Sequence, residues 1–68
     1  MSVRVKLNGQ PRELPDGSTV AQAVTELTAA AAGVAAAVNG DVVPRGSWAA
    51  TRLRDGDRVE VVTAVQGG

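Results

Sequence analysis

The sequence predicts one small α+β domain, in which a single main helix packs on one face of a mixed sheet of four to five strands. Three observations predict it. Both ends of the chain alternate between apolar and polar residues, as half-buried strands do. Two Asn-Gly dipeptides mark hairpins, and an amphipathic helical segment lies between them. With 68 residues the chain has room for one core, since a domain of this size buries only about 60% of its unfolded surface.

The first hairpin is predicted at the N-terminal end. Residues 2–7 alternate between polar and apolar side chains, which predicts a strand with one buried face. Asn8-Gly9 tolerates the positive φ angles of a tight turn, so the chain should return antiparallel through residues 10–14. Pro11 has no N–H for a ladder hydrogen bond, which places the second strand at a sheet edge.

The helix is predicted to begin at Val20, because Thr19 and Gln22 have the spacing of a capping box. Apolar residues then recur at the spacing of one helical stripe, namely Val20, Ala23, Val24 and Leu27. We expect the helix to end within residues 29–32, with Gly33 as its left-handed cap.

The second half of the chain contains a short hairpin and an irregular segment. Residues 34–38 and 41–43 flank the Asn39-Gly40 turn and should pair with each other. The apolar residues of segment 45–54 recur at neither helical nor strand spacing. We expect Trp48 and Leu53 to cover the sheet edge from an irregular or 3₁₀ segment, with Trp48 filling the core rather than anchoring a partner.

The last strand follows an Asp55-Gly56-Asp57 turn and has the clearest alternation in the chain. Its inward positions are Val59, Val61, Thr63 and Val65, and its outward positions are Arg58, Glu60, Val62 and Ala64. If the first and last strands are neighbours they must run parallel, because the helix crossover reverses the chain. That arrangement is the β-grasp fold, and we place the first and last strands side by side by analogy with that fold. We therefore expect a β-grasp domain over residues 1–65 and a flexible tail over residues 66–68.

Composition excludes several classes of function. The chain has neither cysteine nor histidine, so it lacks thiolate and imidazole chemistry and the usual zinc ligands. Its 7 basic and 7 acidic residues balance, which predicts no binding to nucleic acid or to a membrane. No apolar run approaches the roughly 20 residues that span a bilayer. No secretion signal follows Met1, so we expect a cytoplasmic protein.

The arginines of the second half admit two interpretations. They could form a basic patch for an acidic partner or for nucleic acid, but acidic residues interleave with them, which favours solvated surface side chains. The residues concerned are Arg45, Arg52, Arg54 and Arg58.

The tail is the main candidate for chemistry. Gln66, Gly67 and Gly68 extend roughly 10 Å beyond the last strand, and the two glycines lack the Cβ that would block a narrow channel. Chain termini without a function are often glycine-rich too, but these two glycines come almost directly after the final strand, which favours a functional tail. A terminal carboxylate is an anion at neutral pH and needs activation, usually as an acyl-adenylate. The chain has no phosphate-binding motif, so a separate enzyme must activate Gly68.

Over nearly its whole length the chain resembles the ThiS sulfur carriers of bacterial thiamine biosynthesis. The resemblance is strongest in four segments, namely Val38-Asn39-Gly40, Val43-Pro44-Arg45 with Trp48, Asp55-Gly56-Asp57 with Val59-Glu60, and Ala64-Val65-Gln66-Gly67-Gly68. The Val-Pro-Arg and Trp elements help to separate ThiS from the small subunit of molybdopterin synthase and from other diglycine carriers.

The resemblance implies a cycle of sulfur transfer. A ThiF-like adenylyltransferase, using ATP and Mg²⁺, would adenylate Gly68; a persulfide donor would supply sulfur; and the Gly68 thiocarboxylate would serve thiazole synthase. The chain itself would hold no metal and no cofactor and would have no catalytic residue. Gln66 and Gly67 would give partners access to the tail. From the strand alternation alone, the apolar residues beside the tail are either docking positions, which we favour, or scattered surface apolar side chains; they are Val62, Ala64 and Val65.

Three other functions stay open from the sequence. The tail chemistry also fits a sulfur carrier of molybdopterin or of another sulfur pathway. A noncovalent β-grasp binding module would make no use of Gly67 and Gly68. A protein-conjugating modifier would form an isopeptide bond from Gly68 to a lysine of its target.

Overall fold

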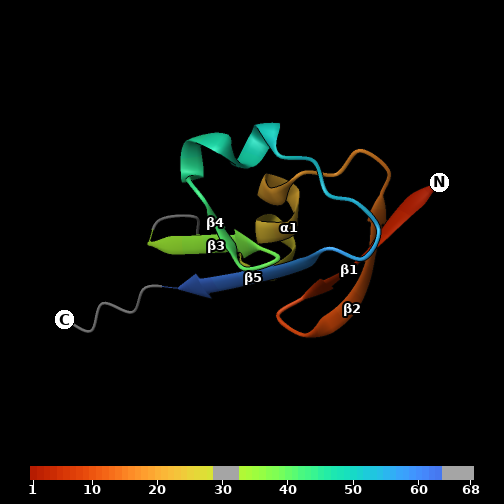
Figure 1. Ribbon diagram of the computed structural model, residues 1–68, viewed down its shortest axis with the longest axis horizontal. Coiled ribbons are helices and arrows are strands. Elements are labelled where there is room, and N and C mark those ends of the chain that lie inside the picture. Colours follow the sequence, from red (N-terminus) through yellow and green to blue (C-terminus); the bar gives the residue numbers. More distant parts are fainter. Residues whose placement is uncertain (29–32, 64–68) are drawn as a thin grey trace.

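The computed structural model describes residues 1–28 and 33–63, which form a five-stranded mixed sheet with one α-helix packed against it (Figure 1). In chain order the elements are β1 (Ser2–Leu7), β2 (Gln10–Pro15), α1 (Val20–Leu27), β3 (Val34–Val38), β4 (Asp41–Val43), the 3₁₀ helix η1 (Arg45–Ala50) and β5 (Arg58–Thr63). The predicted β-grasp class is confirmed.

The sheet has the order β2-β1-β5-β3-β4, so β5 is its central strand. β1 and β5 run parallel, with Lys6 beside Arg58 and Leu7 beside Val59. The other neighbouring pairs are antiparallel. The predicted parallel pairing of the first and last strands is therefore confirmed, as is the edge position of β2.

The start of α1 is set by the predicted capping box. The Thr19 hydroxyl accepts a hydrogen bond from the Gln22 backbone N–H at 3.4 Å, and the Gln22 side-chain oxygen accepts one from the Thr19 backbone N–H at 3.0 Å. These bonds satisfy N–H groups that have no partner inside the helix. The predicted stripe faces the sheet: Val20, Ala23 and Val24 are buried and Leu27 packs against the core.

The predicted end of the helix is wrong. α1 ends at Leu27, and Thr28 is already extended, with φ −152° and ψ 143°. Gly33 does have a positive φ of 73°, but it lies in the turn before β3 and does not cap α1. Thr28 is β-branched and the positions after it are alanines, so a longer helix would have buried little additional apolar surface.

The core lies between the sheet and the layer formed by α1 and η1 (Figure 1). Trp48 closes this core from η1 with only 6% of its surface exposed, and its indole N–H donates to the carbonyl oxygen of Val43 at 2.8 Å. Leu53 is also buried. Both predicted core positions are confirmed, and the segment that carries Trp48 is a 3₁₀ helix.

Candidate functional site

The structure divides the predicted site between described and undescribed residues. The tail and the two residues before it lie outside the described ranges, so their roles stay predictions; they are Ala64, Val65, Gln66, Gly67 and Gly68. Val62 is described, and 62% of its surface is exposed on β5. It alternates with the buried Val61, so it lies on the sheet face that points away from α1.

Val62 is one of four apolar residues that lie on this open face and are exposed or half-exposed. Strand pairing places Ala35 of β3 beside Val62, and Ala37 of β3 beside Val42 of β4. Val42 has 74% of its surface exposed. We call these four residues the apolar strip. Sequence reasoning found Val62 but missed Val42, because the pairing of β4 with β3 had to be known before the two valines could be placed on one face.

The Asn8 side chain holds β5 close to its last described residue. Asn8 has a positive φ of 51° in the turn after β1. Its amide N–H donates to the carbonyl oxygen of Val61 at 3.1 Å, and its amide oxygen accepts from the Val61 backbone N–H at 2.7 Å. The amide thus substitutes for a strand residue where β1 has already turned away. We call these two bonds the Asn8 clamp.

The Asn8 clamp can be tested with Asn8→Asp, which keeps the size of the side chain. We expect a loss of about 1–3 kcal/mol in the free energy of unfolding, because a carboxylate cannot donate to the Val61 carbonyl and would face its oxygen. Gln10→Glu makes the same chemical change at an exposed position and should cost less than about 0.5 kcal/mol. Urea denaturation followed by circular dichroism measures both. Equal denaturation midpoints for the two variants would show that the Asn8 clamp does not stabilise the fold.

A second side-chain network fixes the start of β5. The Asp57 carboxylate accepts from the Asn39 amide at 3.0 Å and from the Arg54 backbone N–H at 2.8 Å, while the Asn39 side-chain oxygen accepts from the Arg58 backbone N–H at 3.0 Å. β5 is therefore held by side chains at both ends. The central strand that leads toward the tail has a fixed direction relative to the open face.

Among the described residues, no group of three acidic side chains lies close enough together to hold a metal ion. The same part of the chain contains no helix that is long and apolar enough to cross a bilayer.

Several known proteins that are similar to this chain are named ThiS. The ThiS family model matches residues 5–68. The chain is 32% identical over 66 residues to the sulfur carrier protein ThiS of Escherichia coli, covering 97% of this chain and all of that one. It is 41% identical over 64 residues to ThiS of Thermus thermophilus, covering 94% of this chain and 98% of the relative.

A larger relative and a solved structure extend this comparison. The chain is 32% identical over 66 residues to part of a thiazole synthase of Paramagnetospirillum magneticum, of which it covers 20%. A crystal structure of ThiS from Geobacter metallireducens superposes with a TM-score of 0.77 at 30% identity, covering 97% of this chain and 100% of that chain. By the match of its sequence from residue 5 to residue 68 and by its fold, the chain belongs to the ThiS family.

Proposed function

We propose that this ThiS-family sulfur carrier holds its sulfur as a thiocarboxylate on Gly68. The observation that carries the proposal is the family match, which runs through residue 68 and so includes both glycines. Composition supports it: without cysteine, the chain has no thiol on which to carry sulfur as a persulfide. The carboxyl carbon of Gly68 is a place where a sulfur atom can be attached and released by acyl chemistry.

In the proposed cycle, an oxygen of the Gly68 carboxylate attacks the α-phosphorus of ATP on a separate, ThiF-like adenylyltransferase, and pyrophosphate leaves. Mg²⁺ on that enzyme neutralises the phosphate charge. The outer sulfur of a persulfide donor then attacks the acyl carbon and AMP leaves, which gives an acyl disulfide. A second thiol attacks the donor's sulfur in that disulfide and releases the Gly68 thiocarboxylate, so the donor and the thiol leave as a disulfide. The carrier supplies the reacting carbon and the surface that positions it, and the enzyme supplies ATP binding and catalysis.

Intact mass spectrometry tests this proposal. The purified chain is incubated with the adenylyltransferase, ATP, Mg²⁺, a persulfide donor and a thiol reductant. We expect a mass increase equal to the exchange of one oxygen for one sulfur, located at Gly68 by fragmentation, and no increase without ATP. An unchanged mass with active enzyme would overturn the proposal, and a mass that reports an isopeptide bond to a lysine would indicate a protein-conjugating modifier.

We propose thiazole synthase as the acceptor of the sulfur. A thiazole synthase with a segment similar to this chain supports the pairing, because linking two proteins in one chain raises their effective concentration for each other. Incubating the thiocarboxylate form with thiazole synthase and its substrates should return the carrier to its original mass. Transfer only to molybdopterin synthase would assign the carrier to the other pathway.

We also propose that the apolar strip is where partners contact the carrier beside the tail. An enzyme that receives the tail must rest on the adjoining surface, and exposed valines on one face provide area for such contacts. Ala64 and Val65, between β5 and the tail, are proposed to continue this contact.

Val62→Glu tests the apolar strip. We expect it to raise the KM of the adenylyltransferase for the carrier by about 10-fold or more, because a charge would be buried against the partner. Ala49→Glu, at an exposed position of η1, is the matched control and should leave the KM within about 2-fold. A Val62 variant that behaves like the Ala49 variant would place docking elsewhere.

A further inference from the structure

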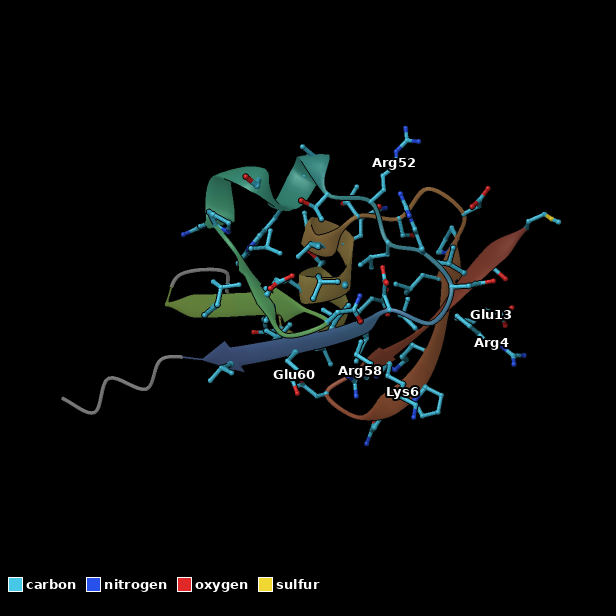
Figure 2. The ribbon with its side chains drawn as sticks, viewed as in Figure 1. Arg4, Lys6, Glu13, Arg52, Arg58 and Glu60 are labelled. Carbon is cyan, nitrogen blue, oxygen red and sulfur yellow. The ribbon has the colours of Figure 1, made fainter. Side chains whose placement is uncertain are left out.

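Three cations gather on the open face of the sheet, at the end where β5 begins. Arg4 and Lys6 occupy alternate positions of β1, and Lys6 lies beside Arg58 in the parallel pairing of β1 with β5. Figure 2 shows all three on the side of the sheet away from α1. They line a hollow of about 450 Å³ together with Pro11 and Asp55. We call the three cations the basic row.

No side chain of the basic row is in an ion pair with any residue that the structure describes, although Glu13 lies beside Arg4 in the pairing of β1 with β2 and Glu60 lies two positions after Arg58 on β5. Among the described residues the only ion pair joins Arg12 to Glu26. Asp55 borders the hollow, but one of its carboxylate oxygens accepts a hydrogen bond from the Arg4 backbone N–H at 2.8 Å and so holds the strand in place. The Glu13 carboxylate accepts a hydrogen bond from the Ser2 hydroxyl at 2.6 Å. The three cationic groups are therefore available to an external anion.

The placement of these charges destabilises the sheet. Like charges on directly neighbouring strands repel, and Lys6 is paired with Arg58 although the chain has 7 acidic residues and no net charge. Local arrangements that break a folding rule without a visible gain are concentrated at functional sites. The repulsion would become an attraction once a partner placed carboxylates between the two strands.

We propose that the basic row docks an acidic segment of the adenylyltransferase that activates Gly68, an inference that rests on the proposed function. The segment would be extended, with carboxylates two residues apart, because Arg4 and Lys6 are about 7 Å apart along β1. Such a segment would pair with both cations and bring a carboxylate close to Arg58.

The distance between the basic row and the tail favours this enzyme. Arg58 and Thr63 are the first and last residues of β5 and lie about 17 Å apart, at about 3.4 Å per residue. An enzyme that binds ATP needs positive potential around the phosphates, so an acidic docking segment must lie away from its active site. The carrier meets this requirement, because its cations lie at the opposite end of the open face from Thr63, the last described residue of β5. Two separated contacts, basic row and apolar strip, would fix the direction in which the tail enters the enzyme.

Lys6→Glu is the decisive variant, and Arg52→Glu is its control. Both variants exchange one positive charge for one negative charge, and Figure 2 places Arg52 on the side of the sheet that carries α1 and η1. For Lys6→Glu we expect the KM for the carrier to rise at least about 10-fold at low salt with kcat unchanged, and the effect to shrink near 1 M salt, where the Debye length is about 3 Å. Arg52→Glu should stay within about 2-fold of the unmodified chain.

Thermal denaturation separates binding from folding. The carboxylate introduced by Lys6→Glu lies between Arg4 and Arg58, so the melting temperature should be unchanged or higher while the KM rises. A purely structural role for Lys6 predicts the opposite change in stability. Lys6→Gln, which removes the charge without reversing it, should give a smaller increase in KM in the same direction.

The outcomes distinguish this inference from the proposed function. If the unmodified chain is adenylated and Lys6→Glu has the KM of Arg52→Glu, the docking inference is wrong and the carrier function stands. If the unmodified chain is not adenylated at all, the proposed function itself fails. If Lys6→Glu leaves the KM unchanged but abolishes binding of a single-stranded oligonucleotide at 150 mM salt, the basic row is a nucleic-acid site and the proposal is overturned.

Discussion

Deletion of Gly68 is expected to abolish formation of the thiocarboxylate while leaving the domain folded. The deleted chain still ends in a carboxylate, that of Gly67, but the reacting carbon lies one residue, about 3.3–3.6 Å, short of its position. A displacement of about 1 Å can already cost about 100-fold in rate, so we expect the yield under standard conditions to fall below detection. The readout is the intact mass after incubation with enzyme, ATP and sulfur donor.

A second tail variant distinguishes the effect of tail length from the effect of side-chain size. Gly68→Val restores the length but adds a β-branched side chain, and we expect it to fail as well, because the channel that admits two glycines would exclude it. Gln66→Ala keeps the length and both glycines and should retain thiocarboxylate formation to a greater extent than either variant.

The fold provides the control for these tail variants. The buried core residues that the structure describes end at Val61, so removal of Gly68 should leave the far-UV circular dichroism spectrum and the denaturation midpoint unchanged. A deletion variant that forms thiocarboxylate normally would assign no role to Gly68. Loss of the folded spectrum would show that the tail belongs to the domain.

Much of the fold could be predicted because its signals are local. Strand alternation, the Asn-Gly turns and the Thr19–Gln22 capping box each involve residues within a few positions of one another, and the structure confirms them. The predicted end of α1 is wrong because the prediction followed the high helix propensity of a run of alanines. The observed end depends instead on how much apolar surface each further turn would bury.

The contacts that define the open face could not be predicted from the sequence. Asn8 and Val61 are 53 positions apart, and the side-chain amide bonds between them need the register of β1 against β5. The pairing of Lys6 with Arg58 depends on the same register. From the sequence alone Arg58 is one of several solvated arginines, and nothing in the local pattern places it next to Arg4 and Lys6.

Replacement of Trp48 by alanine is expected to lower the free energy of unfolding by about 3–5 kcal/mol, the largest loss from any single core substitution in this chain. Truncating a buried Trp costs about 3–5 kcal/mol, and a domain of this length has a total stability of about 3–10 kcal/mol. Trp48 is the chain's single aromatic residue in a core otherwise made of Val, Leu and Ala, so no neighbouring ring can fill the cavity. The carbonyl oxygen of Val43 also loses the indole N–H that donates to it at 2.8 Å.

Two further variants divide this cost between packing and hydrogen bonding. Trp48→Phe retains an aromatic ring but removes the indole donor, so it should lose about 1–3 kcal/mol beyond any change in packing and remain folded. Val42→Ala, at a residue with 74% of its surface exposed, should cost less than about 0.5 kcal/mol. Circular dichroism must follow the transitions, because Trp48→Ala removes the only tryptophan. A Trp48→Ala midpoint equal to that of Val42→Ala would mean that the small side chains pack the core without the indole ring.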